Sequence, residues 1–379
     1  MPLSGITVVE MGEAIAGPFS AQTLGDFGAT VYKVENPDGG DSTRRMGNPR
    51  PYGSAAPFHA VNRNKRSVVL DLKDPAQSKL LRTFLLKKAD VFIQNLRPGT
   101  VGKLGLDPDD LRREKPGLIC ASVRAFSKKG ANATKPGYDF LMEGFSGIMA
   151  ITGEPDRPPS RVGIALIDFA TAQWILIGVL QALRERDRTG QGCHIETSLF
   201  EVAMNLMNFP IGQYRTSGEE PGRWGSGTGI VVPYQAFPTQ DRLIVVAPGN
   251  DRLFRKFAEA LGHLEWADDP RFCNTGLRIE NKHLLLPLIE AVFKTDTCDN
   301  WVARIEAAGV PAGPLHDVRE ICTHPELAAS EVSAKVPGRP DLEVILNPLS
   351  FNGTRPGITR APPDLGADTE EFMRIVQGL

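Results

Sequence analysis

Three carboxylates stand where catalytic groups are often found, in turns or at the ends of predicted strands. Glu13 follows the first predicted strand, and Asp168 follows an apolar run. Asp139 lies in the triplet Gly137-Tyr138-Asp139. A carboxylate can act as a general base or as a nucleophile. The residue types alone leave both roles open, and for Asp139 a structural role in its turn is an equal alternative.

Motifs for several other chemistries are missing. The sequence contains no GxxxxGK[ST] phosphate loop, no HExxH zinc helix and no GxSxG nucleophile elbow. Its 5 cysteines form no CxxC pair, so we expect free thiols in a reducing cytoplasm and no metal site. None of the 6 histidines lies in a motif, and His59 and His194 are expected to be buried structural residues.

The stretch from Arg161 to Arg186 organises the rest of the chain. Val162–Ile167 predicts a buried strand of a parallel sheet, with Asp168 at its carboxyl end. From Phe169 the pattern is that of a largely buried helix, in which Gly178 indicates close approach of a neighbouring element. Parallel sheets bind ligands beyond the carboxyl ends of their strands, which favours a functional Asp168. The alternative is an N-cap of the helix.

The elements that must position these residues predict an α/β fold with a large parallel-sheet domain of the Rossmann type. Strands are expected at Ile6–Glu10, Thr30–Glu35, Val68–Asp71, Asp90–Gln94, Leu118–Val123, His194–Thr197 and Leu243–Ala247. Further helices are expected at Pro75–Lys88, Leu199–Phe209, Asp251–Leu261, Asn281–Phe293 and Cys298–Ala308. The first turn, MGEAIAG, lacks GxGxxG, so a nicotinamide dehydrogenase is not expected.

Length and composition suggest a two-domain globular protein. We expect a large domain over residues 1–216, a glycine-rich linker over 217–229, a smaller α/β domain over 230–325, and a tail over 326–379 that returns to the large domain. The net charge of -2 argues against a nucleic-acid partner. No apolar run approaches the length of a membrane span, and the N-terminus does not resemble a secretory signal, so we expect a cytoplasmic protein.

Basic and amide residues follow several predicted strands. They are Lys73, Asn95, Arg97 and Arg124, with Lys103 a little further along the chain. Each alone fits solvated surface charge. At adjoining ends of one sheet, however, they would form a positive rim for a phosphate-rich ligand, and coenzyme A would suit it.

An ordered series of segments resembles the family III coenzyme A transferases, which include formyl-CoA:oxalate and crotonobetaine CoA-transferases and the related 2-methylacyl-CoA racemases. The segments include VVEMGEAIAGPFSAQTLGDFGATVYKVENPDGGD, NRNKRSVVLDLK, ADVFIQNLRPG, LICASVRAFS, KPGYDF, GIALIDFATA, TGQGCHIETSLFE, GVPAGPL and APPDLG. They extend over nearly the full length of the chain.

The resemblance implies roles for particular residues. The family's catalytic aspartate corresponds to Asp168, which would form a mixed anhydride with the acyl group of an acyl-CoA and then an aspartyl-CoA thioester, which the acceptor acid displaces. Coenzyme A would be a substrate, with no permanently bound cofactor and no metal. The family's CoA-contacting positions correspond to Ala14, Leu70, Lys73, Asn95, Leu96, Lys103 and Arg124. Where the formyl-CoA enzyme has an adenine-side arginine this chain has Asn36, for which Arg44 or Arg45 would have to compensate.

The resemblance also separates two branches of the family. In the racemases a histidine of a Gly-His-Asp triplet moves protons at the α-carbon, but here that position is Tyr138. Tyrosine, with a pKa near ~10, is a poor replacement at neutral pH, so transfer is favoured over racemisation. Tyr138 and Asp139 then remain candidates for supporting roles. A CoA-binding protein without turnover is a third alternative.

The family's dimers consist of two interlocked rings, and the resemblance implies such a homodimer. The substrates would be an acyl-CoA and a carboxylic acid whose identities the sequence does not specify. Arg161, Arg223 and Tyr138 are the residues that would favour an acceptor with a second carboxylate.

Overall fold

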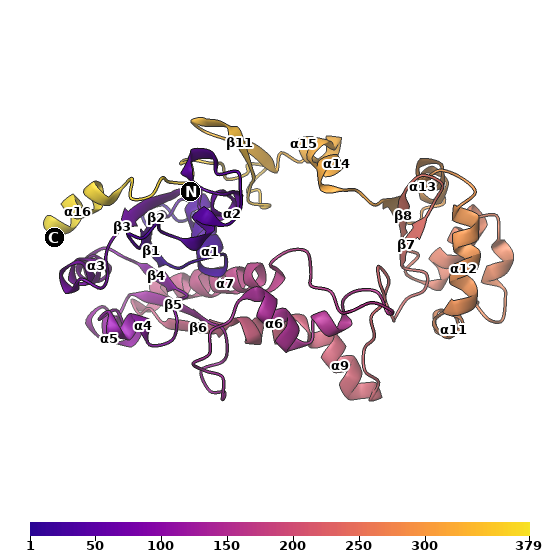
Figure 1. Ribbon diagram of the computed structural model, residues 1–379, viewed down its shortest axis with the longest axis horizontal. Helices are drawn as coiled ribbons and strands as arrows, with labels where there is room; N and C mark the ends of the chain where they lie inside the picture. Colours follow the sequence, from indigo (N-terminus) through magenta and orange to yellow (C-terminus); the bar gives the residue numbers. More distant parts are fainter. The chain divides into compact units, whose positions relative to one another are not determined.

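The computed structural model describes residues 1–379 as two compact units. The first unit comprises Met1–Ser146, Gly163–Leu206 and Pro325–Leu379, and the second comprises Gly147–Val162 and Met207–His324. Residues 147–162 and 207–216, which the sequence-based division put with the large domain, belong here to the second unit. In Figure 1 the C-terminal helix lies beside the N-terminal strands, as expected for a tail that belongs to the first unit.

A six-stranded parallel sheet forms the centre of the first unit, in the order β3-β2-β1-β4-β5-β6. This is the strand order of doubly wound nucleotide-binding domains. Successive strands are added toward one edge of the sheet up to β3 and toward the other edge from β4, so the order reverses between β1 and β4. The strands are β1 (Thr7–Met11), β2 (Thr30–Glu35), β3 (Lys65–Val69), β4 (Val91–Gln94), β5 (Ile119–Arg124) and β6 (His194–Ser198). The predicted α/β fold with a parallel sheet is therefore confirmed.

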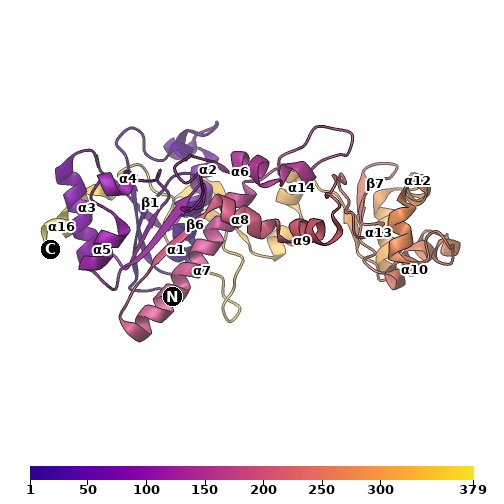
Figure 2. The ribbon, with the colours of Figure 1, turned by 90° about the horizontal axis from the view of Figure 1, so that it is seen from below.

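Helices cover both faces of this sheet (Figures 1 and 2). The helices of the unit are α1 (Ala16–Asp26), α2 (Ala56–Val61), α3 (Pro75–Lys87), α4 (Thr100–Lys103), α5 (Pro108–Glu114), α6 (Asp139–Ser146), α7 (Leu166–Thr189), α8 (Leu199–Leu206), α15 (Pro325–Ala329) and α16 (Thr369–Gln377). A hairpin of β10 (Ser333–Val336) and β11 (Arg339–Ile345) completes the unit.

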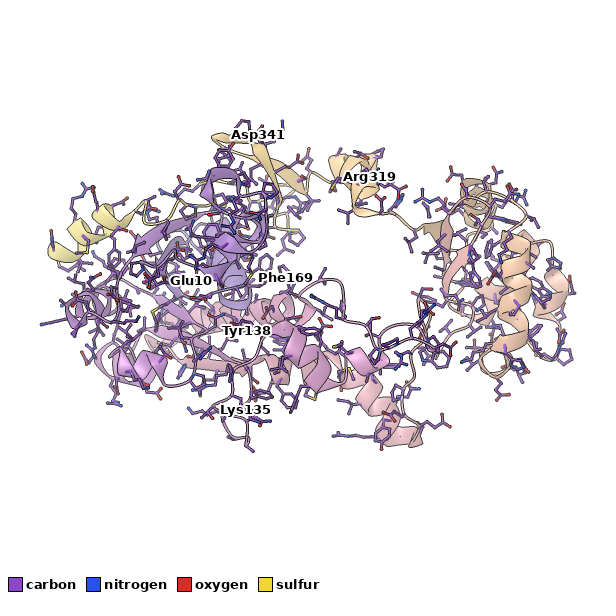
Figure 3. All side chains as sticks on the ribbon, viewed as in Figure 1. Glu10, Lys135, Tyr138, Phe169, Arg319 and Asp341 are labelled. Atoms are coloured by element: carbon purple, nitrogen blue, oxygen red, sulfur yellow. The ribbon has the colours of Figure 1, made fainter.

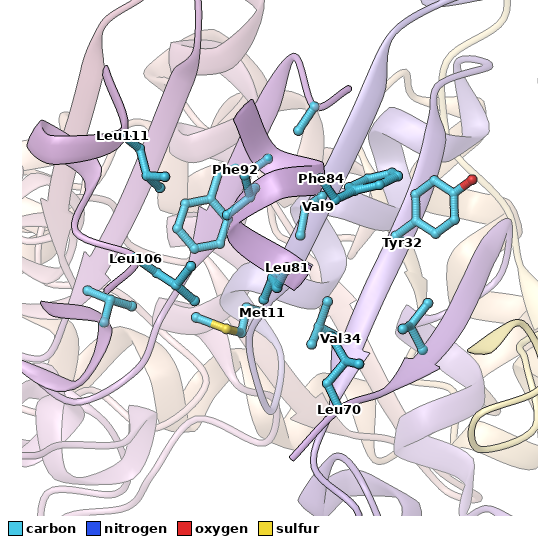
Figure 4. Packing of buried hydrophobic residues seen from close by; sticks show 14 of the residues in the cluster. Val9, Met11, Tyr32, Val34, Leu70, Leu81, Phe84, Phe92, Leu106 and Leu111 are labelled. Carbon is cyan, nitrogen blue, oxygen red and sulfur yellow. The ribbon is translucent and has the colours of Figure 1, made fainter. Parts of the chain in front are cut away.

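One hydrophobic core of this unit lies under α3, α5 and α16, where apolar side chains of the strands meet those of the helices (Figure 4). Phe372 of α16 packs against Phe84 and Tyr32, with ring centroids 4.6 and 5.8 Å away. The opposite face carries α1 and α7. Gly178 of α7 allows that helix to lie on β6, because a Cβ there would stand 3.1 Å from Ile195. This is the close approach that the sequence indicated.

One local prediction is wrong. Val162–Ile167 is not a strand: residues 162–165 form an irregular segment, and α7 already begins at Leu166. A short apolar run fits a strand or the start of a buried helix equally well, and here the helix continues to Thr189. The sixth strand instead follows the helix, at His194–Ser198. Asp168 therefore lies in the first turn of a helix, and the N-cap of that helix is Ala165.

The other predicted elements mostly occur with small shifts in their ends. Strand β3 begins at Lys65, earlier than the predicted Val68. The predicted helix Leu199–Phe209 is two helices, α8 and α9 (Asn208–Ser217). By length and composition α7 could cross a membrane, but in this structure it packs against α1 and the sheet.

The second unit has its own core, built on a three-stranded antiparallel sheet. Its strands are β7 (Gln235–Pro238), β8 (Leu243–Val246) and β9 (Ala312–Pro314), and its helices besides α9 are α10 (Asp251–Ala260), α11 (Thr275–Glu280), α12 (Lys282–Phe293), α13 (Cys298–Ala307) and α14 (Val318–Thr323). Fully buried Arg278 donates to the carbonyl oxygens of Val232 and Phe272, which fastens the segment before β7 to the helices.

Candidate active site

Two adjoining cavities follow the carboxyl-terminal edge of the parallel sheet. The Asp168 cavity, of about 290 Å³, lies beyond the ends of β1, β4 and β5. The β2–β3 cavity, of about 320 Å³, lies beyond the ends of β1, β2 and β3. Glu13 and Leu96 line both. Because β1 and β4 flank the point where the strand order reverses, the two cavities occupy the position at which doubly wound sheets bind ligands.

Asp168 reaches the first cavity from the N-terminal turn of α7. Its carboxyl group forms no hydrogen bond or ion pair with protein groups. Burial, and then the nearby Asp139 carboxylate, raise the pKa of Asp168 to about 7. A carboxylate that is desolvated, unpartnered and exposed to a cavity is suited to nucleophilic attack or to proton abstraction.

The N-cap residue Ala165 has no side chain that could cap α7, and the side chain of Asp139, from another helix, does so instead. Its Oδ2 accepts hydrogen bonds from the backbone nitrogens of Ile167 at 2.8 Å and Asp168 at 3.0 Å. Its Oδ1 is buried and has no hydrogen-bond partner. The sequence pointed to Asp168 as the possible cap and to Asp139 as a supporting residue. In the structure Asp139 is the cap, and this leaves the Asp168 side chain free to face the cavity.

The loop after β1 forms the wall shared by the two cavities, and side chains fix its backbone. The Asn95 amide accepts from the Glu13 nitrogen at 2.9 Å and donates to the Glu13 oxygen at 2.8 Å. Glu10 accepts from the Gly12 nitrogen at 2.8 Å, and Lys33 donates to the Gly12 oxygen at 2.9 Å. A Cβ at position 12 would lie 2.9 Å from both Asn95 Oδ1 and Glu10 Oε1, so any residue other than glycine would displace these two side chains. Ala14, in the same loop, has a left-handed backbone conformation with φ of 63°.

Sequence reasoning missed the buried charges beneath this loop. Lys33 pairs with Asp41 at 2.8 Å and with Glu10 at 3.2 Å, and Lys65 also pairs with Glu10 at 3.2 Å. Burial lowers the pKa of Lys65 to about 8 despite Glu10, whereas the facing carboxylates outweigh burial and raise that of Lys33. The available signal was a charged residue inside each of two strands that are otherwise apolar, ITVVE and TVYKVE.

Most of the predicted CoA-contacting residues line the two cavities. Ala14, Asn95, Leu96 and Arg124 line the Asp168 cavity, and Leu70, Lys73 and Leu96 line the β2–β3 cavity. Lys103 lines neither, although it ends the short helix α4, whose Thr100 lines the second cavity. Whether these residues bind CoA stays a prediction.

The structure separates the two arginines considered as substitutes near Asn36. Arg44 is buried, pairs with Glu35 at 2.7 Å and lies 3.7 Å from the centroid of the Phe58 ring, so it cannot serve a ligand without breaking this pair. Arg45 is exposed and donates to the carbonyl oxygen of Asp38, a residue of the β2–β3 cavity. Only Arg45 remains as a substitute.

Three cationic side chains line the Asp168 cavity together with the carboxylate. They are Arg97, Arg124 and Lys135, and Tyr138 also lines the cavity with a side chain that is 70% exposed. Figure 3 marks Tyr138, Lys135 and, next to Asp168 in the chain, Phe169. Arg124 lies 3.5 Å from Glu196, and Arg97 and Lys135 form no ion pair. Arg223 donates to three backbone carbonyls within the second unit, at Glu154, Pro155 and Arg157.

The two histidines predicted to be structural belong to the first unit, and neither lines the Asp168 cavity or the β2–β3 cavity. His59 is 1% exposed and bonds to the carbonyl oxygen of Pro51 at 2.9 Å, and burial lowers its pKa. His194 bonds to Ser122 at 2.9 Å. Their contacts agree with structural roles.

Comparison with known proteins identifies the same family that the sequence segments resemble, and the match covers nearly the whole chain. Residues 3–369 match the family described as CoA-transferase family III. The chain is 35% identical to a succinate–glutarate CoA-transferase of Agrobacterium fabrum, with 98% of this chain and 97% of the relative aligned. It is also 35% identical to an acetyl-CoA:oxalate CoA-transferase of Acetobacter aceti, with 98% and 96% aligned.

A solved structure has the same fold. The CAIB/BAIF family protein from Brucella suis superimposes with a TM-score of 0.88 at 35% identity, and the match covers 99% of each chain. Its similarity extends over both units. On these matches and on the arrangement of the cleft, the chain belongs to CoA-transferase family III.

Proposed function

We propose that this enzyme moves coenzyme A from an acyl-CoA to a free carboxylic acid, with Asp168 as the nucleophile. The observation that carries the proposal is the Asp168 carboxyl group, which faces a cavity without a hydrogen-bond partner in a chain of this family. A nucleophile must be reachable and must not be engaged in a strong hydrogen bond, and Asp168 meets both requirements because Asp139 caps the helix in its place.

The proposed reaction conserves the thioester through four displacements. The Asp168 carboxylate attacks the donor thioester, which forms an aspartyl mixed anhydride and releases CoA thiolate. The thiolate attacks the aspartyl carbon, which forms aspartyl-CoA and releases the donor acid. The acceptor carboxylate then attacks aspartyl-CoA, and the released thiolate attacks the acyl carbon of the new anhydride. The products are the acceptor's CoA ester and free Asp168.

The chain supplies electrostatic help at the places where charge changes. The N-terminal end of α7 carries partial positive charge beside Asp168, which favours the ionised nucleophile. Arg97, Arg124 and Lys135 line the same cavity and would attract anionic substrates. A CoA molecule that reaches Asp168 with its thioester would place its nucleotide toward the β2–β3 cavity.

The acceptor class that we propose is a short dicarboxylic acid. One carboxylate reacts at Asp168, and the three cations of the cavity provide a partner for the second. The names of the two relatives, a succinate–glutarate and an acetyl-CoA:oxalate CoA-transferase, support this class. The decisive experiment is a mass-spectrometric panel of acetyl-, succinyl- and glutaryl-CoA against monocarboxylic and dicarboxylic acceptors.

The panel distinguishes the proposed function from its alternatives. We expect at least one donor–dicarboxylate pair to exchange CoA with rates well above those of the matched monocarboxylates. Exchange only with monocarboxylates would refute the proposed acceptor class. Deuterium incorporation at the α-carbon of 2-methylacyl-CoA without an acceptor would show racemisation. CoA binding without exchange in any pair would refute transfer.

The pH dependence follows from the state of Asp168. Because its pKa is raised to about 7, the nucleophile is mostly protonated below that pH and ionised above it. We therefore expect kcat/KM for the donor to rise with pH through an apparent pKa of about 7 and then to level off. A profile that is flat from pH 5 to 9 would contradict the assignment of this group.

Asp139→Asn tests the capping carboxylate separately. The amide oxygen can still accept from the backbone of α7, but its negative charge is gone, so the inflection of the same profile should move to lower pH. Because asparagine caps a helix about as well as aspartate, the free energy of unfolding should fall by about 0.5–2 kcal/mol only in Asp139→Ala, which removes the cap. An unchanged inflection in Asp139→Asn together with reduced stability in Asp139→Ala would leave Asp139 with a structural role only.

We also propose a cytoplasmic, interlocked homodimer without a resident cofactor. The five cysteines are free thiols, which agrees with a reducing compartment.

Trp174 and Ile177 leave an apolar strip on α7, with exposed fractions of 46% and 47%, as expected of a surface that another chain covers. Light scattering should give twice the chain mass of 41.2 kDa, and a single-chain mass would refute the dimer.

A further inference from the structure

Glu13 occupies a position in the cleft that the catalytic account leaves unused. Glu13 and Leu96 line both the Asp168 cavity and the β2–β3 cavity. A ligand with its nucleotide in one cavity and its thioester at Asp168 must pass this point. If the proposed function holds, the passing segment is the pantetheine arm, which carries two amide groups.

The backbone around Glu13 is fixed on both sides. Both peptide groups of the residue are engaged by the amide of Asn95, and those of Gly12 are engaged by Glu10 and Lys33. Ala14, the next residue, is held at a positive φ of 63°. Left-handed backbone in a non-glycine residue is unfavourable and persists where surrounding contacts enforce it, often at functional sites. The fold therefore fixes the backbone position from which the Glu13 side chain projects.

The surroundings of the Glu13 carboxyl group are mixed in charge. Asp41, Lys33, Ser42 and Arg45 all interact with it electrostatically or by hydrogen bonding. Burial and then Asp41 raise its pKa, while Lys33, Ser42 and Arg45 oppose this. Asp41 itself is already paired with Lys33 at 2.8 Å. Glu13 has no such carboxylate-to-cation pair, so its oxygens can serve a ligand.

We propose that the Glu13 carboxyl group hydrogen-bonds an amide of the pantetheine arm and so aligns the thioester with Asp168. An ionised Glu13 accepts from an amide N–H of the arm, and a protonated Glu13 donates to an amide oxygen. Either bond can form where apolar contact with Leu96 removes the arm from water. Glu13 is then a binding residue that determines the ligand's register in the cleft.

The test compares two ligands by isothermal titration calorimetry at pH 7. Coenzyme A carries the arm, and adenosine 3′,5′-bisphosphate lacks it. Glu13→Ala should raise the Kd of CoA about 10-fold, the typical effect of one hydrogen bond lost with a buried group, and change the Kd of the bisphosphate less than about 2-fold. Glu13→Gln, which keeps a donor and an acceptor, should retain most of the CoA affinity.

Asp38→Ala is the matched control, because Asp38 lines the β2–β3 cavity only. Removing its charge should change both dissociation constants by a similar factor and leave their ratio unaltered. Glu13→Ala effects that are equal for the two ligands, or an unchanged Kd for CoA, would overturn the proposal. Failure of the unsubstituted enzyme to bind CoA would instead refute the proposed function.

Discussion

Replacement of Asp168 by alanine or asparagine should lower CoA transfer by about 10³-fold or more, the scale seen when a catalytic nucleophile is removed. The only other carboxylate-bearing residue that lines its cavity is Glu13, which lies at the junction with the β2–β3 cavity. The measurement is the initial rate of acceptor-CoA formation with the best pair of the substrate panel.

The control for this loss is Asp187→Asn, an exposed aspartate on the same helix. It should keep full activity. Asp168→Asn should also fold at least as stably as the unsubstituted chain at pH 8, because an ionised carboxylate with a raised pKa opposes folding above its unfolded pKa. Transfer by Asp168→Asn at more than about a tenth of the normal rate would refute nucleophilic catalysis by this residue.

Lys33→Met should cause the largest loss of stability among the substitutions considered. The Lys33 side chain is 0% exposed and pairs with Asp41 and Glu10, so its removal leaves buried carboxylates without their main cation. Breaking a buried pair from one side lowers the free energy of unfolding by about 3–5 kcal/mol. Chemical denaturation with urea at pH 7 measures this difference.

The pH dependence and two further variants sharpen the Lys33 prediction. Because the pKa of Lys33 is raised, its stabilisation is complete below the unfolded pKa of ~10.5, so the deficit should stay constant from pH 6 to 9. Lys79→Met, on the exposed side of α3, should change stability by less than about 0.5 kcal/mol. Glu10→Gln added to Lys33→Met should recover part of the loss. A Lys33→Met deficit below about 1 kcal/mol would contradict the structural role of the buried charges.

Local patterns were sufficient to predict the sheet and most of the helices. β1, β2, β4 and β5 are short apolar runs between turn residues, and their parallel order follows from the alternation with helices. The positions that form the cleft, such as Asn95, Leu96 and Arg124, follow directly from the ends of these strands. For that reason the amino-acid sequence alone was enough to predict that these residues gather at one edge of the sheet.

Contacts between distant residues could not be predicted. Asp139 caps a helix 28 residues away, and nothing in either segment shows that they meet. The contact between Lys33 and Glu10, 23 residues apart, could not be predicted either. A charged residue inside a buried strand indicates only that it has a partner, and does not identify that partner. Val162–Ile167 failed for a different reason, since a six-residue apolar run does not distinguish a strand from the first turn of a buried helix.

Trapping the covalent intermediate tests the role of Asp168 most directly. The enzyme is incubated with acyl-CoA alone, treated with hydroxylamine and digested, and the peptide that contains Asp168 is analysed by mass spectrometry. An aspartyl anhydride or thioester should give a hydroxamate at Asp168 that depends on acyl-CoA and is absent from Asp168→Asn. Active enzyme that yields no hydroxamate at Asp168, or yields one at another carboxylate, would contradict the account.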